Sequence, residues 1–141
     1  MNLYINIIDN KPVERNNVFV VKGEINIGDC SEILYIPLDW WSLTDYKQQW
    51  QEGLMRLKNY DTSCLVVAVH NPSIRPYINW WLLYKVENKI YVRNQLLIED
   101  AYAEQIGNKV FTVQNCYEFI PSRCDRYDED GDEISEWTIN L

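Results

Sequence analysis

The sequence lacks most of the short motifs that mark common catalytic and cofactor sites. It has no Gly-x-Gly-x-x-Gly or phosphate-loop lysine motif, no Gly-x-Ser-x-Gly elbow and no Cys-x-x-Cys pair. His70 is the only histidine, which excludes a metal site or a proton relay built from two histidines. We therefore expect no metal ion and no cofactor, and we expect that the protein is not an enzyme.

The four cysteines, Cys30, Cys64, Cys116 and Cys124, are widely and irregularly spaced. This spacing indicates free thiols in a reducing compartment. A cysteine-dependent hydrolase is a weaker alternative, with Cys64, Cys116 or Cys124 as the nucleophile. Cys64 and His70 would not form a catalytic pair on one strand, because a rise of ~3.3 Å per residue places them roughly 20 Å apart.

Long apolar runs and positive charge are also scarce. No stretch approaches the ~18 apolar residues of a membrane span, and residues 1–9 lack the basic leader and cleavage site of a signal peptide. We therefore expect a cytoplasmic protein that does not bind membranes. The chain has 21 acidic and 13 basic side chains, a net charge of −8. Because non-specific nucleic-acid binding depends on Lys and Arg that neutralise phosphates, we expect no direct nucleic-acid partner.

The negative charge is concentrated near the C-terminus, where residues 121–141 carry seven carboxylates and two arginines. Asp130-Gly131 is a strong hairpin signal, because a type I′ turn needs positive φ at both central residues. Alternating side chains predict a strand over 134–141. We predict that the acidic cluster lies at the tip of a C-terminal hairpin and attracts a basic partner. The alternative is a solvated tip that only adds solubility.

The acidic cluster does not fit a calcium-binding loop. With Gly131 at the sixth position of such a loop, Arg126 would be first and Trp137 twelfth, where carboxylates are required. Paired carboxylates can also hydrolyse glycosides, but on an exposed turn no burial would separate their pKa values. We therefore predict neither a metal site nor a catalytic site in this segment.

Hydrophobic patterning predicts an α+β fold with a mostly antiparallel sheet. Strands are predicted over residues 4–8, 18–27, 33–38, 64–70, 77–86, 89–97 and 110–113. The 64–70 run is apolar throughout, as is typical of a central strand buried on both faces. One amphipathic helix is predicted from about Leu43 to Asn59, after a capping-box-like Ser42 and Asp45, and a short helical turn over 99–107. We expect residues 1–141 to form one domain with the helix packed on the sheet.

Six tryptophans and ten tyrosines require their own interpretation. Trp40-Trp41 and Trp80-Trp81 are adjacent pairs, and neighbouring residues of a strand point to opposite faces. One ring of each pair can therefore enter the core while the other covers the second face. We assign most of these rings to the core and the remainder to a protein interface, where Trp and Tyr contribute strongly to affinity.

Four blocks of the sequence, in this order, resemble the immunity proteins of bacterial contact-dependent growth inhibition systems. They are residues 45–54, 78–84, 90–97 and 131–137. The resemblance implies a cytoplasmic binding protein that forms a tight one-to-one complex with the C-terminal domain of a toxin and blocks its active site. It also implies that the toxin is often a nuclease, frequently directed at tRNA, and a nuclease needs a basic surface to hold phosphates.

The residues in these blocks are expected to pack the shared core, whereas the residues that select one toxin should vary. We therefore predict toxin-binding residues among the acidic positions. The first set is Asp125, Asp128, Glu129, Asp130 and Asp132, and the second is Glu24 and Asp29. An adaptor or structural protein that binds a basic partner is the alternative interpretation.

Overall fold

The computed structural model describes residues 2–123 and 134–141. In chain order its elements are β1 (Leu3–Arg15), β2 (Val18–Ile27), β3 (Cys30–Pro37), α1 (Leu43–Arg56), β4 (Thr62–Val69), β5 (Tyr77–Val86), β6 (Lys89–Ile98), α2 (Glu99–Gln105), the 3-10 helix η1 (Cys116–Phe119) and β7 (Trp137–Asn140). The strands form two antiparallel sheets with the orders β1-β2-β3 and β4-β5-β6-β7. The predicted α+β class is confirmed.

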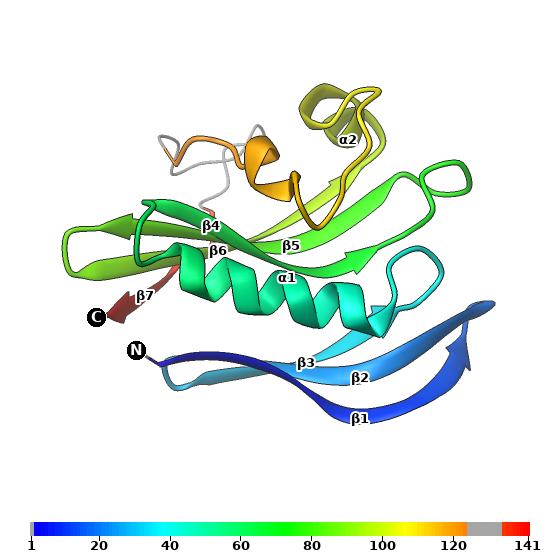
Figure 1. The fold of residues 1–141 in the computed structure, drawn as a ribbon, viewed down its shortest axis with the longest axis horizontal. Helices are drawn as coiled ribbons and strands as arrows, with labels where there is room; N and C mark the ends of the chain where they lie inside the picture. The colour runs from blue at the N-terminus through cyan, green and yellow to red at the C-terminus, as the bar shows by residue number, and fades with distance from the viewer. Residues whose placement is uncertain (1, 124–133) are drawn as a thin grey trace.

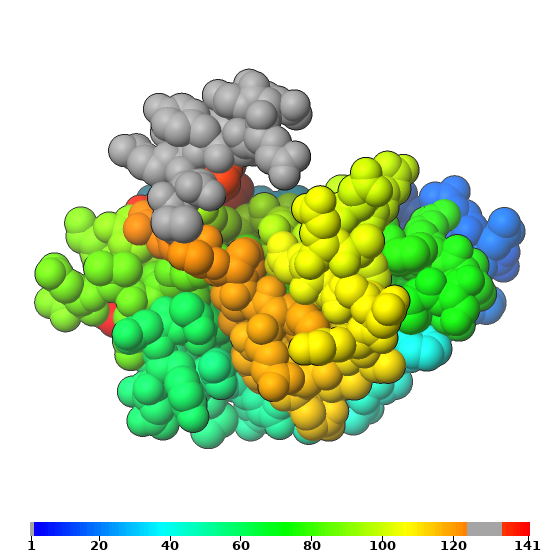
Figure 2. All heavy atoms as spheres, turned by 90° about the horizontal axis from the view of Figure 1, so that it is seen from above, coloured from blue at the N-terminus to red at the C-terminus, as the bar shows by residue number. Residues whose placement is uncertain are grey.

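The main helix is seen between the two sheets in Figure 1, with the three-stranded sheet below it and the four-stranded sheet above. Tyr46 and Trp50 of α1 belong to the same hydrophobic core as Ile25 and Ile36 of the three-stranded sheet. On the face seen from above in Figure 2, α2 lies beside the segment 106–123. None of the helices in the described part of the chain is long and apolar enough to span a membrane.

Two-residue turns connect the strands of the three-stranded sheet, and the strands predicted over 4–8 and 18–27 belong to its first hairpin. Asn16 and Asn17 both have positive φ, 51° and 66°, as a type I′ turn requires. Gly28, with φ of 60°, begins the turn between β2 and β3. β1 is an edge strand, and two register shifts interrupt its pairing with β2. Such irregularities make an edge a poorer template for uncontrolled strand pairing.

Helix α1 begins with the predicted capping box. The hydroxyl of Ser42 accepts a hydrogen bond from the backbone N–H of Asp45 (3.1 Å), and the carboxylate of Asp45 accepts one from the N–H of Ser42 (2.9 Å). The helix ends at Arg56, three residues before the predicted Asn59. There the backbone tightens, because the N–H of Asn59 bonds to the carbonyl of Arg56 instead of one residue further back.

β4 is an edge strand, so its predicted central position in the sheet is wrong. Its predicted burial on both faces is confirmed, since residues 64–69 are all buried. Side chains of α1 satisfy the open edge. Gln49 accepts a hydrogen bond from the N–H of Val66 (2.7 Å) and donates one to the carbonyl of Cys64 (2.8 Å). The indole of Trp50 donates to the carbonyl of Val66 (2.7 Å). The helix therefore takes the place of a neighbouring strand.

The predicted strand over Val110–Val113 is wrong. Reciprocal bonds join Thr112 and Asn115, whose side chains each accept from the other's backbone N–H, at 2.7 and 3.1 Å. The amide of Asn115 also donates to the carbonyl of Val110 (2.7 Å). These bonds hold the backbone in a local turn. Within this run Phe111 and Val113 are buried, and the ring of Phe111 lies 5.3 Å from that of Trp80.

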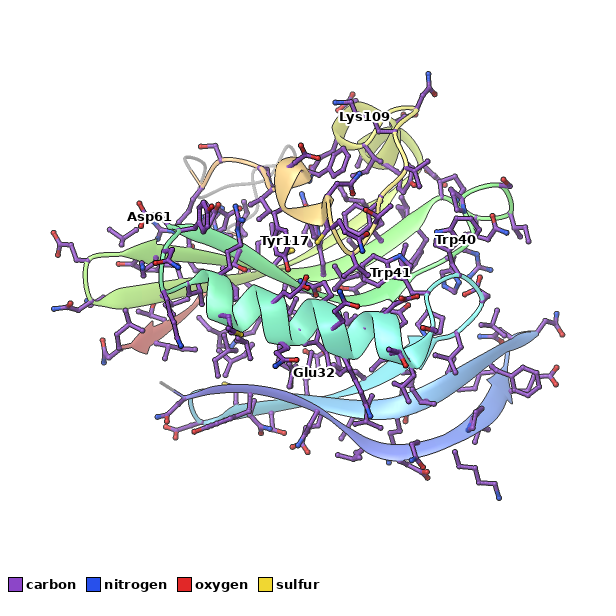
Figure 3. The ribbon with its side chains drawn as sticks, in the orientation of Figure 1. Glu32, Trp40, Trp41, Asp61, Lys109 and Tyr117 are labelled. Atoms are coloured by element: carbon purple, nitrogen blue, oxygen red, sulfur yellow. The ribbon has the colours of Figure 1, made fainter. Side chains whose placement is uncertain are left out.

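The tryptophan pairs behave differently from each other. In the loop before α1, Trp41 is 5% exposed and Trp40 is 43% exposed, and both residues are labelled in Figure 3. Trp80 and Trp81, on β5, are both buried, and the ring of Trp81 lies 5.5 Å from that of Trp137. One ring enters the core in the first pair, and both do so in the second.

The final strand, β7, begins at Trp137, three residues later than predicted, and pairs with β6. Ile139 faces the core, in agreement with the apolar face predicted for this segment. The predicted turn at Asp130-Gly131 lies outside the described residues.

Candidate functional site

The two predicted sets of acidic residues belong to different parts of the chain. The first set, Asp125, Asp128, Glu129, Asp130 and Asp132, lies outside the described residues. Glu24 is partly buried on β2, and Asp29 is exposed in the turn between β2 and β3. Arg123 and Glu136, which flank the first set in sequence, contact β6 in the other sheet. Glu24 and Asp29 therefore belong to the three-stranded sheet and one of its turns, whereas these flanking residues contact the four-stranded sheet.

Glu24 lies in the middle of an exposed sheet surface. In the register of the strands it is opposite Asn6 and Ile33, with Tyr4 and Tyr35 two residues away on β1 and β3. Tyr4, Ile33 and Tyr35 are 59%, 43% and 50% exposed. We call the surface formed by Tyr4, Glu24, Ile33 and Tyr35 the outer sheet face. Exposed aromatic side chains around a carboxylate suit a protein interface, because such rings give large contact area and the charge gives orientation.

The other side of this sheet belongs to the core. Ile25, Leu34 and Ile36 are buried there, since successive residues of a strand point to opposite faces. Glu32, labelled in Figure 3, is paired with Ile25 and so lies on the side toward α1. On the outer sheet face, the hydroxyl of Ser31 donates to the carboxylate of Glu24 at 2.5 Å. This bond fixes the orientation of the carboxylate.

The charge pattern of the sequence predicted Glu24 as a binding residue but did not single out its apolar neighbours. The segment 33–38 was interpreted as one apolar strand, and that interpretation did not separate Ile33 and Tyr35 from the buried Leu34 and Ile36. The strand alternation could have separated them, because residues 33 and 35 share one face and residues 34 and 36 the other. The tyrosine at 35 indicates which face is exposed, since tyrosine tolerates exposure better than isoleucine.

An ion-pair network joins the two ends of the acidic C-terminal segment. The guanidinium of Arg123 donates to both carboxylate oxygens of Glu136, at 2.7 and 2.9 Å, and Arg93 donates to one of them at 2.7 Å. Arg123 also stacks on the ring of Tyr91, 3.7 Å from its centroid. These contacts hold Arg123 and Glu136 together against β6.

The electrostatics of this network favour the ionised carboxylate. Partial burial alone would raise the pKa of Glu136, but hydrogen bonds from Arg123 and Arg93 outweigh it and place that pKa below its ordinary value of 4.5. The hydrogen bond to Glu136 correspondingly raises the pKa of Arg123. Because Arg93 is buried, its charge depends on Glu136 for compensation.

Replacing Glu136 with glutamine is expected to lower the free energy of unfolding at pH 7 by about 2 kcal/mol, because it leaves the buried charge of Arg93 uncompensated. The folded-state pKa is depressed, so this contribution is present above pH 4.5 and is lost as the pH falls through the folded-state pKa. Urea unfolding of the wild-type protein and of Glu136→Gln at a series of pH values between 7 and 3 measures this contribution to the free energy of unfolding. The exposed Glu87→Gln variant is the control, and a difference that did not shrink in acid would contradict the expectation.

The buried thiols do not form a nucleophilic site. Cys64 and Cys116 are fully buried, with their sulfur atoms 3.8 Å apart. Burial, followed by the hydrogen bond with Cys116, raises the pKa of Cys64 well above its usual value, so the thiol stays protonated. Burial also raises the pKa of the neighbouring Tyr117. This geometry argues against the hydrolase alternative at these two positions, while Cys124 lies outside the described residues.

Metal ligands do not gather in the described ranges, 2–123 and 134–141, where no group of three His, Cys, Asp or Glu side chains is placed to hold an ion. The single histidine, His70, instead pairs through Nδ1 with the carboxylate of Asp39, at 2.9 Å. Its ring contacts the edge of Tyr77, with the centroids 4.9 Å apart.

Comparison with known proteins identifies the family. Residues 36–141 match the family model described as the CdiI N-terminal domain. The chain is 34% identical over 133 residues to the immunity protein CdiI of Enterobacter cloacae subsp. cloacae, an alignment that covers 93% of this chain and 86% of that protein. It is also similar to a chain in the CdiA-CT/CdiI toxin and immunity complex from Enterobacter cloacae, with a TM-score of 0.80 and 33% identity. The match covers 99% of this chain and 90% of the chain in that complex. The resemblance found in the sequence is confirmed, and the chain belongs to the CdiI family of immunity proteins.

Proposed function

We propose that this protein binds the C-terminal toxin domain of its own system in a one-to-one complex and neutralises it by covering its active or substrate-binding surface. The observation that carries the proposal is the likeness over nearly the whole chain to the immunity protein CdiI and to a chain of a toxin and immunity complex. On this proposal the protein acts in the cytoplasm as an inhibitor and not as an enzyme.

The partner in this proposal is a basic protein whose toxic activity is that of a nuclease. The net charge of −8 supports this part of the proposal, because a nuclease surface must be basic to hold phosphates and an acidic protein competes for it. The inhibitor then offers carboxylates where the nucleic acid would offer phosphates.

Two surfaces share the binding. The acidic residues Asp125, Asp128, Glu129, Asp130 and Asp132 attract the toxin and speed the encounter, supported by the ion-pair network that holds residues 123 and 136 together. The outer sheet face, with Glu24 and the nearby Asp29, supplies contact area and orientation. Exposed tyrosines favour affinity there, because they bury much area at little conformational cost.

Co-expression tests the function directly. The chain is produced together with the toxin C-terminal domain encoded next to it, and growth, complex formation and stoichiometry are measured. We expect restored growth and a stable one-to-one complex. If the toxin arrests growth in the presence of this chain and no complex is isolated, the proposed function is wrong and the adaptor interpretation gains support.

Reversing three charges together, Asp128→Lys, Glu129→Lys and Asp130→Lys, is expected to slow association with the toxin domain by about 10- to 100-fold at low salt, because steering depends on these charges. The loss should shrink as ionic strength rises. Stopped-flow fluorescence measures the rate.

A matched control makes the same change of net charge at exposed positions outside both surfaces. It combines Glu52→Lys, Asp61→Lys and Glu87→Lys. Asp61 lies on the loop before β4, labelled in Figure 3. Equal slowing in both variants would show that only net charge matters and would remove the site assignment at the C-terminal segment.

A further inference from the structure

A pocket of about 200 Å³ opens where the outer side of the three-stranded sheet meets the end of the four-stranded sheet. Arg15 and Tyr35 line it from the first sheet, and His70, Arg75 and Tyr77 from the second. In Figure 1 the β1–β2 turn and the β4–β5 connection lie at the same end of the molecule, at the right. Tyr35 is shared between this pocket and the outer sheet face, so the two surfaces are continuous.

The pocket is positively charged on an acidic protein. Within residues 2–123 and 134–141, neither Arg15 nor Arg75 takes part in an ion pair. The guanidinium of Arg15 stacks on the ring of Tyr35, 3.9 Å from its centroid. Stacking uses the flat face of a guanidinium and leaves the N–H groups of its rim free to donate.

One carboxylate beside this pocket, that of Asp39, is already engaged. Asp39 accepts hydrogen bonds from the Nδ1 of His70 and, at 3.4 Å, from the backbone N–H of Asn71. Its charge is therefore directed to these donors. Arg15 and Arg75 remain as two cationic donors that line one small pocket with no anion paired to them in the described structure.

We propose that this pocket binds one aspartate or glutamate side chain of the toxin domain, an inference that rests on the proposed function. Pockets for cofactors and drug-sized ligands measure ~300–1,000 Å³, and this one, at about 200 Å³, is too small for most of them but has room for an inserted side chain. A polyphosphate chain is disfavoured because the protein as a whole carries a charge of −8. A carboxylate held by two guanidinium groups receives the strong, directional bonds that arginine makes best.

The pocket also determines specificity. Overall charge attracts any basic protein, including unrelated nucleases. A required carboxylate at one position on the partner selects among them, because a toxin that lacks it leaves two arginines desolvated and unpaired. The outer sheet face then contacts the partner through Glu24 at its centre and through the arginine pocket at one end.

The test uses the direction of the effect. Arg15→Gln and Arg75→Gln each make the protein more acidic, so general attraction to a basic toxin should leave association as fast or faster. Loss of a pocket contact should instead raise the dissociation rate by about 10-fold or more for each variant. Lys109→Gln is the matched control, with the same change of charge at an exposed loop residue labelled in Figure 3. Surface plasmon resonance with the toxin C-terminal domain gives both rates.

Two further measurements make the result decisive. Thermal unfolding checks that both variants are folded, and Arg75 is the safer position because its side chain makes no hydrogen bond or ion pair within the described structure. Each surface Asp and Glu of the toxin is then replaced in turn by Asn or Gln. One of these replacements should weaken binding to the wild-type protein but not to the Arg75→Gln variant.

The outcomes separate the two proposals. If wild type binds the toxin and both arginine variants dissociate like Lys109→Gln, the pocket is not a carboxylate site, although the proposed function stands. If wild type itself forms no complex, the proposed function fails, and this inference fails with it.

Discussion

Replacing Gly53 with alanine is expected to destabilise the protein by at least about 3 kcal/mol, although alanine is intrinsically the better helix former by about 1 kcal/mol. Gly53 is buried on the side of α1 that contacts β4. A Cβ atom there would overlap the carbonyl oxygen of Cys64, well inside the 3.0 Å that real Cβ atoms keep. It would also lie 3.3 Å from Leu65.

The neighbours of Gly53 have little freedom to move. The carbonyl of Cys64 is backbone and already accepts a hydrogen bond from Gln49, and the carbonyl of Gly53 accepts one from the hydroxyl of Ser63 at 2.6 Å. To admit a methyl group, the helix must move away from the strand and lose these bonds. The strain therefore exceeds the gain in helix propensity.

Urea unfolding of Gly53→Ala beside Glu52→Ala measures the effect. Glu52 is the exposed neighbour on the same helix, so alanine there should change the free energy of unfolding by less than about 0.5 kcal/mol. If Gly53→Ala were as stable as wild type, the close contact between α1 and β4 would be wrong. A destabilised variant should also protect cells less well, because less folded inhibitor is present.

The sequence predicted those elements whose signals are local. The capping box at Ser42 and the helical spacing of Tyr46 and Trp50 place the start of α1 correctly. The strands predicted over 77–86 and 89–97 also depend on local β-rich runs, and they form the β5–β6 hairpin. Each of these signals extends over at most one turn or a few residues, where the chain's own chemistry decides the structure.

Long-range features were beyond such reasoning. An apolar run such as Cys64–Val69 shows that both faces are covered but not by what, and here a helix supplies the cover and the edge bonds. The run at Val110–Val113 has the apolar pattern of a strand, yet side-chain bonds between Thr112 and Asn115 hold a turn. In both places the competing partner is a polar side chain that no hydrophobic pattern reports.

The candidate site shows the same division. Charge could be counted, so Glu24, Asp29 and the C-terminal carboxylates were predicted as binding residues, and all of these assignments remain predictions. Arg15 and Arg75 are far apart in sequence, and only the meeting of the two sheets places them in one pocket. The spacing of these two residues in the sequence does not predict that they line the same pocket.

Replacing Gln49 with leucine is expected to lower the free energy of unfolding by about 3 kcal/mol, even though leucine is similar in size and more hydrophobic. Gln49 is fully buried, and its amide satisfies the N–H of Val66 and the carbonyl of Cys64. Leucine leaves both backbone groups buried without partners, at about 1–3 kcal/mol each. The amide also contacts the hydroxyl of Tyr117, at 3.3 Å.

The matched control is Gln48→Leu, one residue earlier on the exposed side of α1, where the side chain bonds only to Glu52 within the described structure. It should cost less than about 0.5 kcal/mol. Hydrogen exchange at Val66 gives a second measurement, since its amide should exchange faster in Gln49→Leu and at the wild-type rate in Gln48→Leu. Equal stability of the two variants would mean that β4 does not depend on the helix for its edge bonds.

Gly53 lets the helix approach β4, and Gln49 makes the bonds between them. The double variant with Gly53→Ala and Gln49→Leu should therefore lose less free energy of unfolding than the sum of the two single losses.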